Sequence, residues 1–101
     1  MSDKIYSIEE IRAIAGPVAS EYGIAAMYLF GSYARGEATA QSDLDFRIDK
    51  GQLKSLLQLA GFQLDLEKRF EKDLDILTTQ MLAPNFLSAI HDEEVLIYVR
   101  N

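Results

Sequence analysis

The sequence predicts an α/β (α+β) fold in which helices flank a small mixed β-sheet. Residues 25–30 and 95–99 are apolar runs of strand length, residues 43–49 alternate between apolar and charged side chains, and residues 74–78 form a short strand with Asp75 opposite Leu74 and Ile76. Helical stripes separate these segments. The expected order is α-β-turn-β-α-β-α-β, which suits one sheet covered by helices. At 101 residues and 49% hydrophobic content, we expect a single domain, residues 1–101, with one core.

The overall composition excludes several classes of function. A net charge of −6 makes nucleic acid an improbable direct ligand, because phosphate backbones bind basic surfaces. A nucleotide ligand stays compatible with this charge when metal ions accompany it. The chain has no cysteine, which excludes disulfides and thiolate sites. It also has no signal peptide and no apolar run near the roughly 20 residues of a membrane span, so we expect a cytoplasmic protein with no membrane partner.

The first helix has clear start and stop signals. Ser7 and Glu10 are spaced as a capping box, and Tyr6 and Ile11 can pack around it. Pro17 removes one intrahelical hydrogen bond and predicts a kink, and Gly23 is the expected C-terminal stop. Apolar residues recur at steps of three and four, which predicts a core-facing stripe: Ile8, Ile11, Ala15, Val18 and Tyr22.

A small-residue turn follows the apolar run 25–30. Gly31 and Ser32 end the run, and Ser32 is expected to cap a short helical turn that stops at Gly36. A strand followed by such a turn exposes backbone N–H groups that favour phosphate. Arg35 lies in the same turn, where it can contact phosphate, pair with an acid or only solvate the turn.

Residues 37–42 have little apolar content and are expected to form a loop. The next strand, residues 43–49, alternates between two faces and ends before Gly51. Its apolar face consists of Leu44, Phe46 and Ile48, and its charged face of Asp43, Asp45, Arg47 and Asp49. We expect Arg47 to neutralise the neighbouring carboxylates.

A second long helical region carries two apolar stripes, with Gly61 as a candidate break. One stripe is Leu53, Leu56, Leu57, Ala60 and Leu64, and the other is Leu59, Phe62, Leu66 and Phe70. We expect both to be core, although so broad an apolar arc leaves room for an oligomer or a partner. The charged tail, residues 67–72, is expected to be solvated.

The C-terminal third supplies a strand, a helix and a strand. Residues 74–78 form a strand with Asp73 and Asp75 on one face, and Pro84 suits the first turn of a helix. The expected buried side of that helix is Leu82, Phe86, Leu87 and Ile90. Residues 95–99 form a last strand or a strip for a partner. His91 is expected at the surface, and Tyr33 and Tyr98 in packing contacts.

The carboxylates of Asp43 and Asp45 suggest a metal site. Residues two apart on a strand have Cα atoms roughly 6.5–7 Å apart, so their side chains can lean onto ions about 3.5–4 Å apart. Mg²⁺ prefers such oxygen ligands. A third carboxylate from another strand completes this kind of site, and Asp75 is the best-placed candidate, with Asp73 as the alternative. Clustered carboxylates repel one another, so at least one pKa is expected to be raised.

Together these motifs resemble the nucleotidyltransferase superfamily that shares the palm of DNA polymerase beta. The family pattern is Gly-Ser, about ten residues, Asp-x-Asp and a later Asp. Here it stands as Gly31-Ser32, ten residues, Asp43-Leu44-Asp45, and Asp75. Residues 29–36 with 42–45 are similar to the minimal nucleotidyltransferase (MNT, MntA-type) group in particular.

The resemblance implies a palm-like fold and ATP-dependent transfer of AMP. It implies that Gly31 and Ser32 hold the β- and γ-phosphates, with Arg35 as a further nucleotide-binding candidate. It also implies that Asp43 and Asp45 bind two Mg²⁺ ions, and that Asp75 binds the catalytic ion and orients or deprotonates the acceptor hydroxyl.

The resemblance also implies a partner. Similar MNT proteins pair with a HEPN-domain toxin, a ribonuclease, and adenylylate its tyrosine, which predicts an antitoxin. Larger relatives carry a helical acceptor-binding domain, which we expect this chain to lack, so a partner or a second subunit would complete the site. Two alternatives stay open: transfer to a small molecule with a helical partner subunit, and a non-catalytic antitoxin that acts by binding alone. A homo-oligomer is also compatible.

Overall fold

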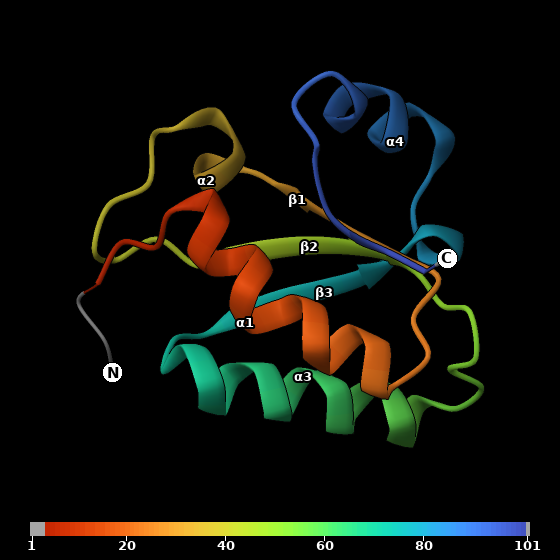
Figure 1. Ribbon diagram of the computed structural model, residues 1–101. Helices are drawn as coiled ribbons and strands as arrows, with labels where there is room; N and C mark the ends of the chain where they lie inside the picture. The colour runs from red at the N-terminus through yellow and green to blue at the C-terminus, as the bar shows by residue number, and fades with distance from the viewer. Residues whose placement is uncertain (1–3, 101) are drawn as a thin grey trace.

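A four-stranded mixed sheet forms the centre of the protein, as the sequence predicted (Figure 1). The computed structural model describes residues 4–100. The strands are β1 (Ala26–Phe30), β2 (Leu44–Asp49), β3 (Leu74–Thr78) and β4 (Val95–Val99), in the spatial order β3-β2-β1-β4. β1 pairs antiparallel with β2 and with β4, and β2 pairs parallel with β3. The parallel pair is therefore the one that carries both Asp-Leu-Asp segments.

Two long helices cover one face of this sheet (Figure 1). They are α1 (Ile8–Glu21) and α3 (Leu56–Phe70). The shorter helices are α2 (Ser32–Arg35), which follows β1, and α4 (Pro84–His91), and a 3-10 helix, η1 (Thr79–Met81), follows β3. Within residues 4–100 no helix is both long and apolar enough to cross a membrane.

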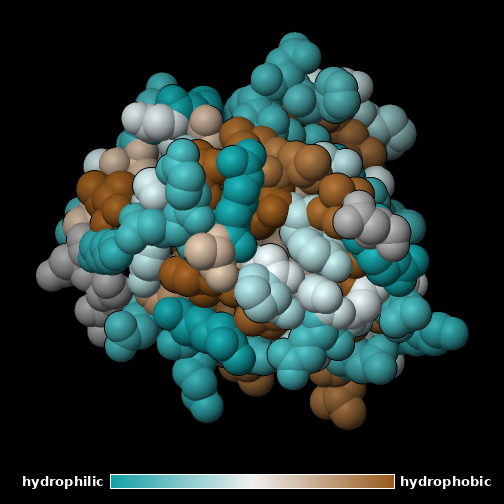
Figure 2. Space-filling model, in the orientation of Figure 1, coloured by the Kyte–Doolittle hydropathy of each residue, from teal (hydrophilic) through white to brown (hydrophobic). Residues whose placement is uncertain are grey.

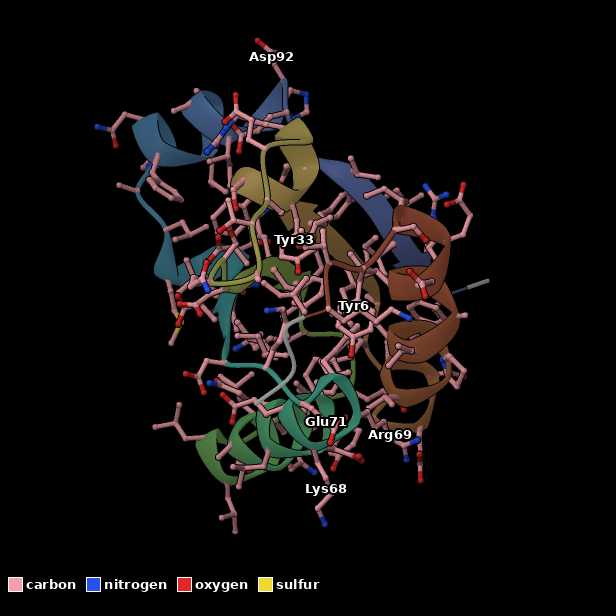
Figure 3. All side chains as sticks on the ribbon, turned by 90° about the vertical axis from the view of Figure 1, so that its left-hand side faces the viewer. Tyr6, Tyr33, Lys68, Arg69, Glu71 and Asp92 are labelled. Atoms are coloured by element: carbon pink, nitrogen blue, oxygen red, sulfur yellow. The ribbon has the colours of Figure 1, made fainter. Side chains whose placement is uncertain are left out.

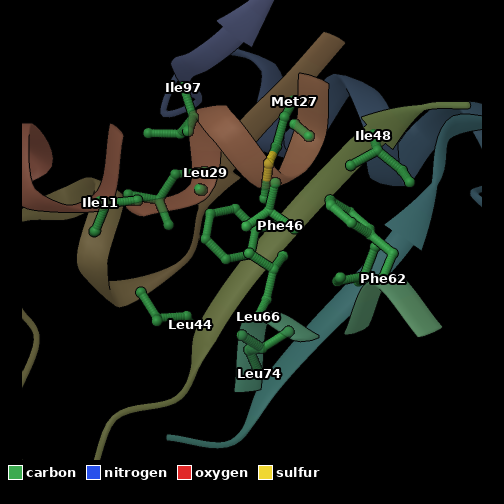
Figure 4. Close-up of a cluster of buried hydrophobic side chains, with 14 of the residues drawn as sticks. Ile11, Met27, Leu29, Leu44, Phe46, Ile48, Phe62, Leu66, Leu74 and Ile97 are labelled. Carbon is green, nitrogen blue, oxygen red and sulfur yellow. The ribbon is translucent and has the colours of Figure 1, made fainter. Parts of the chain in front are cut away.

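The core lies between the sheet and the two long helices (Figure 4). Phe46 on β2 is fully buried at its centre, and its ring lies 6.4 Å from that of Phe70 on α3. Side chains on a strand alternate between faces, so each strand sends every second residue into this layer. Burial of one such side chain stabilises the fold by about 1.5–3 kcal/mol. Among the buried members are Ile11, Val18, Met27, Leu29, Leu44, Ile48, Phe62, Leu66, Leu74 and Ile76.

Helix α1 begins and ends as the sequence predicted. The Ser7 side chain accepts a hydrogen bond from the Glu10 amide at 3.1 Å, and the Glu10 carboxylate accepts one from the Ser7 amide at 2.9 Å. The helix continues through Pro17 to Glu21. Gly23 then reverses the chain with φ +72°, a conformation that glycine adopts without steric cost.

The prediction that both apolar stripes of the second long helical region are core was wrong for most of one stripe, although its first member, Leu53, is buried as predicted. Phe62, Leu66 and Phe70 are buried, but Leu56, Leu57 and Leu64 are 77%, 84% and 65% exposed. Helix α3 runs unbroken through Gly61 and lies against one sheet, so only one stripe can face the core. We call Leu56, Leu57, Ala60 and Leu64 the outer stripe of α3. Figure 2 shows hydrophobic side chains protruding along the lower edge, where α3 lies.

Two further expectations about burial were wrong. Lys72 is only 5% exposed instead of solvated, because its Nζ donates a 2.9 Å hydrogen bond to the Ala40 carbonyl and ties the loop before β2 to the start of β3. Of the four residues expected to be buried around α4, only Ile90 is buried, and Phe86 is 40% exposed. Helix α4 has eight residues and meets the sheet through Phe86, whose ring lies edge-on to Phe30 with centroids 6.1 Å apart. The predicted positions of His91, exposed, and Tyr33, buried, are confirmed.

Candidate active site

The sheet face away from α1 and α3 presents carboxylates at one end, where β1 ends and where β2 and β3 begin. Asp45 on β2 pairs in register with Phe30 on β1 and with Asp75 on β3. Asp45 is half-buried and Asp75 is exposed. The strand order thus places two acids that are thirty positions apart in sequence directly side by side, and brings the residue that follows Phe30 next to them.

Gly31, the residue after β1, lies in close contact with Asp45. Its φ is +78°, and a Cβ at this position would lie 2.4 Å from Oδ2 of Asp45. No residue with a side chain fits here without moving that carboxylate, so glycine lets the backbone approach Asp45 closely. Gly31 itself occupies the N-cap of α2 without a side-chain hydrogen bond, and Ser32 is the first helical residue. The prediction that Ser32 is the cap was therefore wrong, because the turn uses the positive φ of Gly31. Gly36 ends α2 in the left-handed region, as predicted.

The electrostatic state of Asp45 reflects this crowding. Burial, the neighbouring charges of Asp75 and Asp43, and a hydrogen bond with Asp75 raise the pKa of Asp45 to about 6, whereas Arg35 acts to lower it. The expectation of a raised pKa within the cluster is confirmed. We call Asp43, Asp45 and Asp75 the carboxylate cluster.

Asp73 lies outside this cluster although it shares the strand parity of Asp75. It precedes β3, and its carbonyl accepts a hydrogen bond from the Leu44 amide at 3.4 Å. It borders a surface hollow together with Glu67, Glu71 and Lys72, at the end of α3. The causes that shift the pKa of Asp45 include Asp43 and Asp75 but not Asp73.

Arg35 on α2 pairs with two acids. Its Nε donates to Glu37 at 2.9 Å, and its Nη1 donates to the carboxylate of Glu93 at 3.2 and 3.4 Å. Glu93, in the connection between α4 and β4, also accepts a 2.7 Å hydrogen bond from the Gly31 amide. The Gly31 turn therefore already holds one anionic group, contributed by the chain itself.

Sequence reasoning missed Glu93 and its neighbour Glu94. Glu94 accepts two hydrogen bonds from Arg47, at 2.6 and 3.0 Å, and both side chains are nearly buried. Arg47 also lies 3.6 Å from Asp49, which confirms the prediction that it neutralises a carboxylate neighbour. The acidic pair before the last strand was the only sequence signal, and it gave no indication of partners nearly fifty and more than sixty positions away.

The donor set of the carboxylate cluster fits a hard divalent cation. In the described part of the chain, no three His, Cys, Asp or Glu side chains are close enough to hold a metal ion unaided. Mg²⁺ commonly uses one or two protein carboxylates and completes its shell with water and substrate phosphates. Oxygen donors near Asp45, beside a turn that binds an anion, therefore suit a cation that arrives with a polyphosphate.

A separate hollow of about 270 Å³ lies near the end of β3, bordered by Lys50, Thr78 and Met81 among others. It contains none of the three clustered acids, so the chemistry points to the open sheet face instead.

Comparison with known proteins identifies the family. A family model described as polymerase beta, nucleotidyltransferase, matches residues 13–101. MJ0435 of Methanocaldococcus jannaschii, a proposed protein adenylyltransferase, is 35% identical over 89 residues, which are 88% of this chain and 96% of that protein. The protein adenylyltransferase MntA of Thermococcus cleftensis is 28% identical over 95 residues, covering 90% of this chain and 96% of its own.

Solved structures share the fold. A proposed minimal nucleotidyltransferase superposes with a TM-score of 0.76 at 31% identity, covering 89% of this chain and 95% of that one. The complex of the tri-AMPylated Shewanella oneidensis HEPN toxin with an MNT antitoxin contains a chain that matches with a TM-score of 0.70 at 12% identity, covering 92% and 73%. At that identity the second likeness concerns the fold alone. With the family model, two relatives and a structure at 31% identity in agreement, this chain belongs to the polymerase beta nucleotidyltransferase family, in its minimal nucleotidyltransferase group.

Proposed function

We propose that this enzyme transfers AMP from ATP to a tyrosine hydroxyl of a partner HEPN toxin, with Mg²⁺, and so acts as the antitoxin of a toxin–antitoxin pair. The observation that carries the proposal is the position of Asp45, which lies between the Gly31 backbone and Asp75. A phosphate-binding turn and a pair of metal-binding acids are the two parts that nucleotidyl transfer requires.

Each residue of the site has a role in this reaction. The amides of the Gly31–Ser32 turn and the Arg35 guanidinium bind the terminal phosphates of ATP. Asp43, Asp45 and Asp75 would hold two Mg²⁺ ions, which supply charge neutralisation to the triphosphate and to the acceptor oxygen. Asp75 is more exposed than Asp45, so it faces the incoming hydroxyl, orients it and accepts its proton.

The reaction itself is an in-line displacement at phosphorus. The tyrosine oxygen forms a bond to the α-phosphorus of ATP, the bond from that phosphorus to the bridging oxygen breaks, and pyrophosphate leaves with the electron pair. Positioning and charge stabilisation provide most of the rate acceleration in such transfers.

A protein acceptor suits the surface of this chain. The outer stripe of α3 exposes Leu56, Leu57 and Leu64, which offers an apolar surface for protein association on the side of the sheet opposite the carboxylate cluster. The relatives named as protein adenylyltransferases and the HEPN toxin in complex with an MNT antitoxin support a protein acceptor of the same class.

The test is a labelling experiment with the purified protein, Mg²⁺ and ATP labelled at the α-phosphate, in lysate of the source cell. Matched variants are Asp45→Asn, inside the carboxylate cluster, and Asp73→Asn, in the second Asp-Leu-Asp but outside the cluster. We expect one labelled protein band with the wild type and with Asp73→Asn, and none with Asp45→Asn. Mass spectrometry of the band should find AMP on tyrosine of a HEPN-domain protein.

Other outcomes lead to the alternatives. Label that appears equally with Asp45→Asn contradicts the site. Label on a small molecule with no labelled protein supports a small-molecule transferase. Protection of cells from the toxin by the Asp43→Asn, Asp45→Asn double variant would show that neutralisation requires binding alone.

A further inference from the structure

Glu93 occupies a position that the proposed reaction assigns to a phosphate. Its carboxylate accepts a 2.7 Å hydrogen bond from the Gly31 amide and contacts Nη1 of Arg35 at 3.2 and 3.4 Å. These are two of the donors expected to bind the terminal phosphates of ATP. Charge-assisted hydrogen bonds of this kind are among the stronger ones in proteins. The protein therefore satisfies these two donors with a carboxylate of its own chain.

Hydrogen bonds fix the main chain at Glu93 and at the next residue, Glu94. The amides of Glu93 and Glu94 both donate to the Ile90 carbonyl at 3.1 Å. Glu94 is fastened to Arg47 by two hydrogen bonds, and the side chains are 6% and 12% exposed. The Glu93 side chain is 24% exposed, so it can rotate out to water while Glu94 keeps the backbone in place. Asp92, the preceding residue, already points away from the molecule (Figure 3).

We propose that Glu93 is an internal occupant of the phosphate position, which the β- and γ-phosphates of ATP displace and which returns as pyrophosphate leaves. This inference rests on the proposed function and adds a residue that sets which anions the site accepts. A solute with a weak or single anionic group competes poorly with a carboxylate attached to the same chain. A polyphosphate with accompanying cations brings several charged oxygens and replaces both contacts at once.

Competition between the Glu93 carboxylate and a bound phosphate lowers the apparent affinity for the ligand by an amount that can be measured. If Glu93 occupies the position in roughly nine molecules of ten, the apparent affinity for a ligand that needs those donors falls about tenfold. The apparent affinity for a ligand that does not reach Gly31 is not reduced, because such a ligand leaves Glu93 in place. Removing the carboxylate should therefore strengthen the binding of polyphosphates and leave the binding of AMP unchanged.

The test compares Glu93→Gln with Glu37→Gln by titration calorimetry. Both variants remove one negative charge that pairs with Arg35, but only Glu93 also contacts the Gly31 amide. The ligands are AMP-PNP with Mg²⁺, inorganic pyrophosphate with Mg²⁺, and AMP. We expect Glu93→Gln to bind the first two roughly 5- to 10-fold more tightly than the wild type, with a much smaller gain in Glu37→Gln and no change for AMP.

A measurement on the wild type makes the test independent of the variants. The ¹³C resonance of the Glu93 side-chain carboxyl should shift when AMP-PNP with Mg²⁺ saturates the protein, and should not shift with AMP. Equal gains in the two variants, or an equal gain for AMP, would mean a general charge effect and would overturn the inference. If AMP-PNP binds the wild type but Glu93→Gln binds no better, the inference alone fails; if AMP-PNP binds none of the proteins, the proposed function fails with it.

Discussion

The protein contains the tripeptide Asp-Leu-Asp twice, at the start of two adjacent parallel strands, and the surroundings of Asp45 in the first copy differ from those of Asp73 in the second. Leu44 and Leu74 pair in register and are both buried. Asp45 in the first copy is half-buried beside Gly31 and has a pKa of about 6. Asp73 in the second copy lies at the end of α3, beside Glu67 and Glu71. Identical residues therefore have different chemistry because different neighbours surround them.

The difference shows that strand order, and not the tripeptide alone, determines which acids lie together in the carboxylate cluster. β2 is an inner strand with β1 on one side and β3 on the other, so Asp45 meets both Gly31 and Asp75. β3 is an edge strand, so its acids have only one neighbouring strand. A carboxylate at the inner position loses more water and gains more charged neighbours, and both effects raise its pKa.

The largest expected effect is the loss of AMP transfer when an acid of the carboxylate cluster, and not Asp73, is replaced. Asp45→Asn and Asp75→Asn should each lower the rate of AMP transfer roughly 10³-fold, or about 4 kcal/mol, because each removes an oxygen ligand for the ions that neutralise the triphosphate. Asp73→Asn should change the rate less than about threefold. The measurement is the initial rate of AMP incorporation at saturating ATP. A strong loss of rate in Asp73→Asn would mean that Asp73 takes part in the site, and would contradict the assignment of Asp75 alone as the third carboxylate.

The next effect is the loss of nucleotide binding when Gly31, whose backbone closely approaches the Asp45 carboxylate, gains a side chain. Gly31→Ala should abolish measurable binding of AMP-PNP, since the new Cβ would push the Asp45 carboxylate away, and the strained backbone should cost about 1–3 kcal/mol of stability. Gly36→Ala is the matched control, because Gly36 has φ +73° but no atom within 4 Å of an added Cβ. Calorimetric binding and thermal unfolding of the two variants separate the contact from the backbone strain. Equal loss of binding in both would point to strain alone.

A third effect is stabilisation by the ligand. At one hundred times its dissociation constant, AMP-PNP with Mg²⁺ should stabilise the wild type by about 2.7 kcal/mol, or raise Tm by roughly 10 °C. Asp73→Asn should respond equally, and Asp45→Asn should respond little, with Mg²⁺ removed by EDTA as the control. No rise in Tm for the wild type at saturating ligand would count against a nucleotide site on this sheet face.

The smallest effect is the pH dependence of the apo protein. The pKa of Asp45 is raised in the folded state from its ordinary 3.8 to about 6, so the folded state binds more protons than the unfolded state between these values. The stability contributed by protonated Asp45 is therefore present at low pH and is lost as the pH rises through this window. Because Asp45 is half-exposed, solvent screening limits the effect, and Asp45→Asn should melt only about 4 °C above the wild type at pH 7.5.

The control for this last prediction again uses the second tripeptide. Asp73→Asn should follow the wild-type pH profile, and the difference in Tm between Asp45→Asn and the wild type should vanish near pH 4. A difference that is constant with pH would mean that the substitution acts through packing and not through the charge of Asp45.

Local patterns predicted the elements of this fold well. The capping box at Ser7, the stop at Gly23 and the strand with alternating Leu44, Phe46 and Ile48 all depend on neighbours within a few residues, and the structure confirms them. The outer stripe of α3 was misassigned because periodicity shows that a helix has apolar faces but not which face meets the sheet. Lys72 was misassigned because its partner, Ala40, lies in a distant loop.

By itself, the sequence determined which residues can form strands, helices and turns, and which side chains can carry charge to a site. It also carried the motif that indicates the family, since Gly31-Ser32 and Asp43-Leu44-Asp45 lie within one short segment. Only the tertiary structure decided that Asp75 and not Asp73 stands beside Asp45, and that Glu93 reaches Gly31 across 62 positions. The physical reason is that local patterns act through the backbone of a few residues, whereas strand order and side-chain contacts arise when the whole core packs.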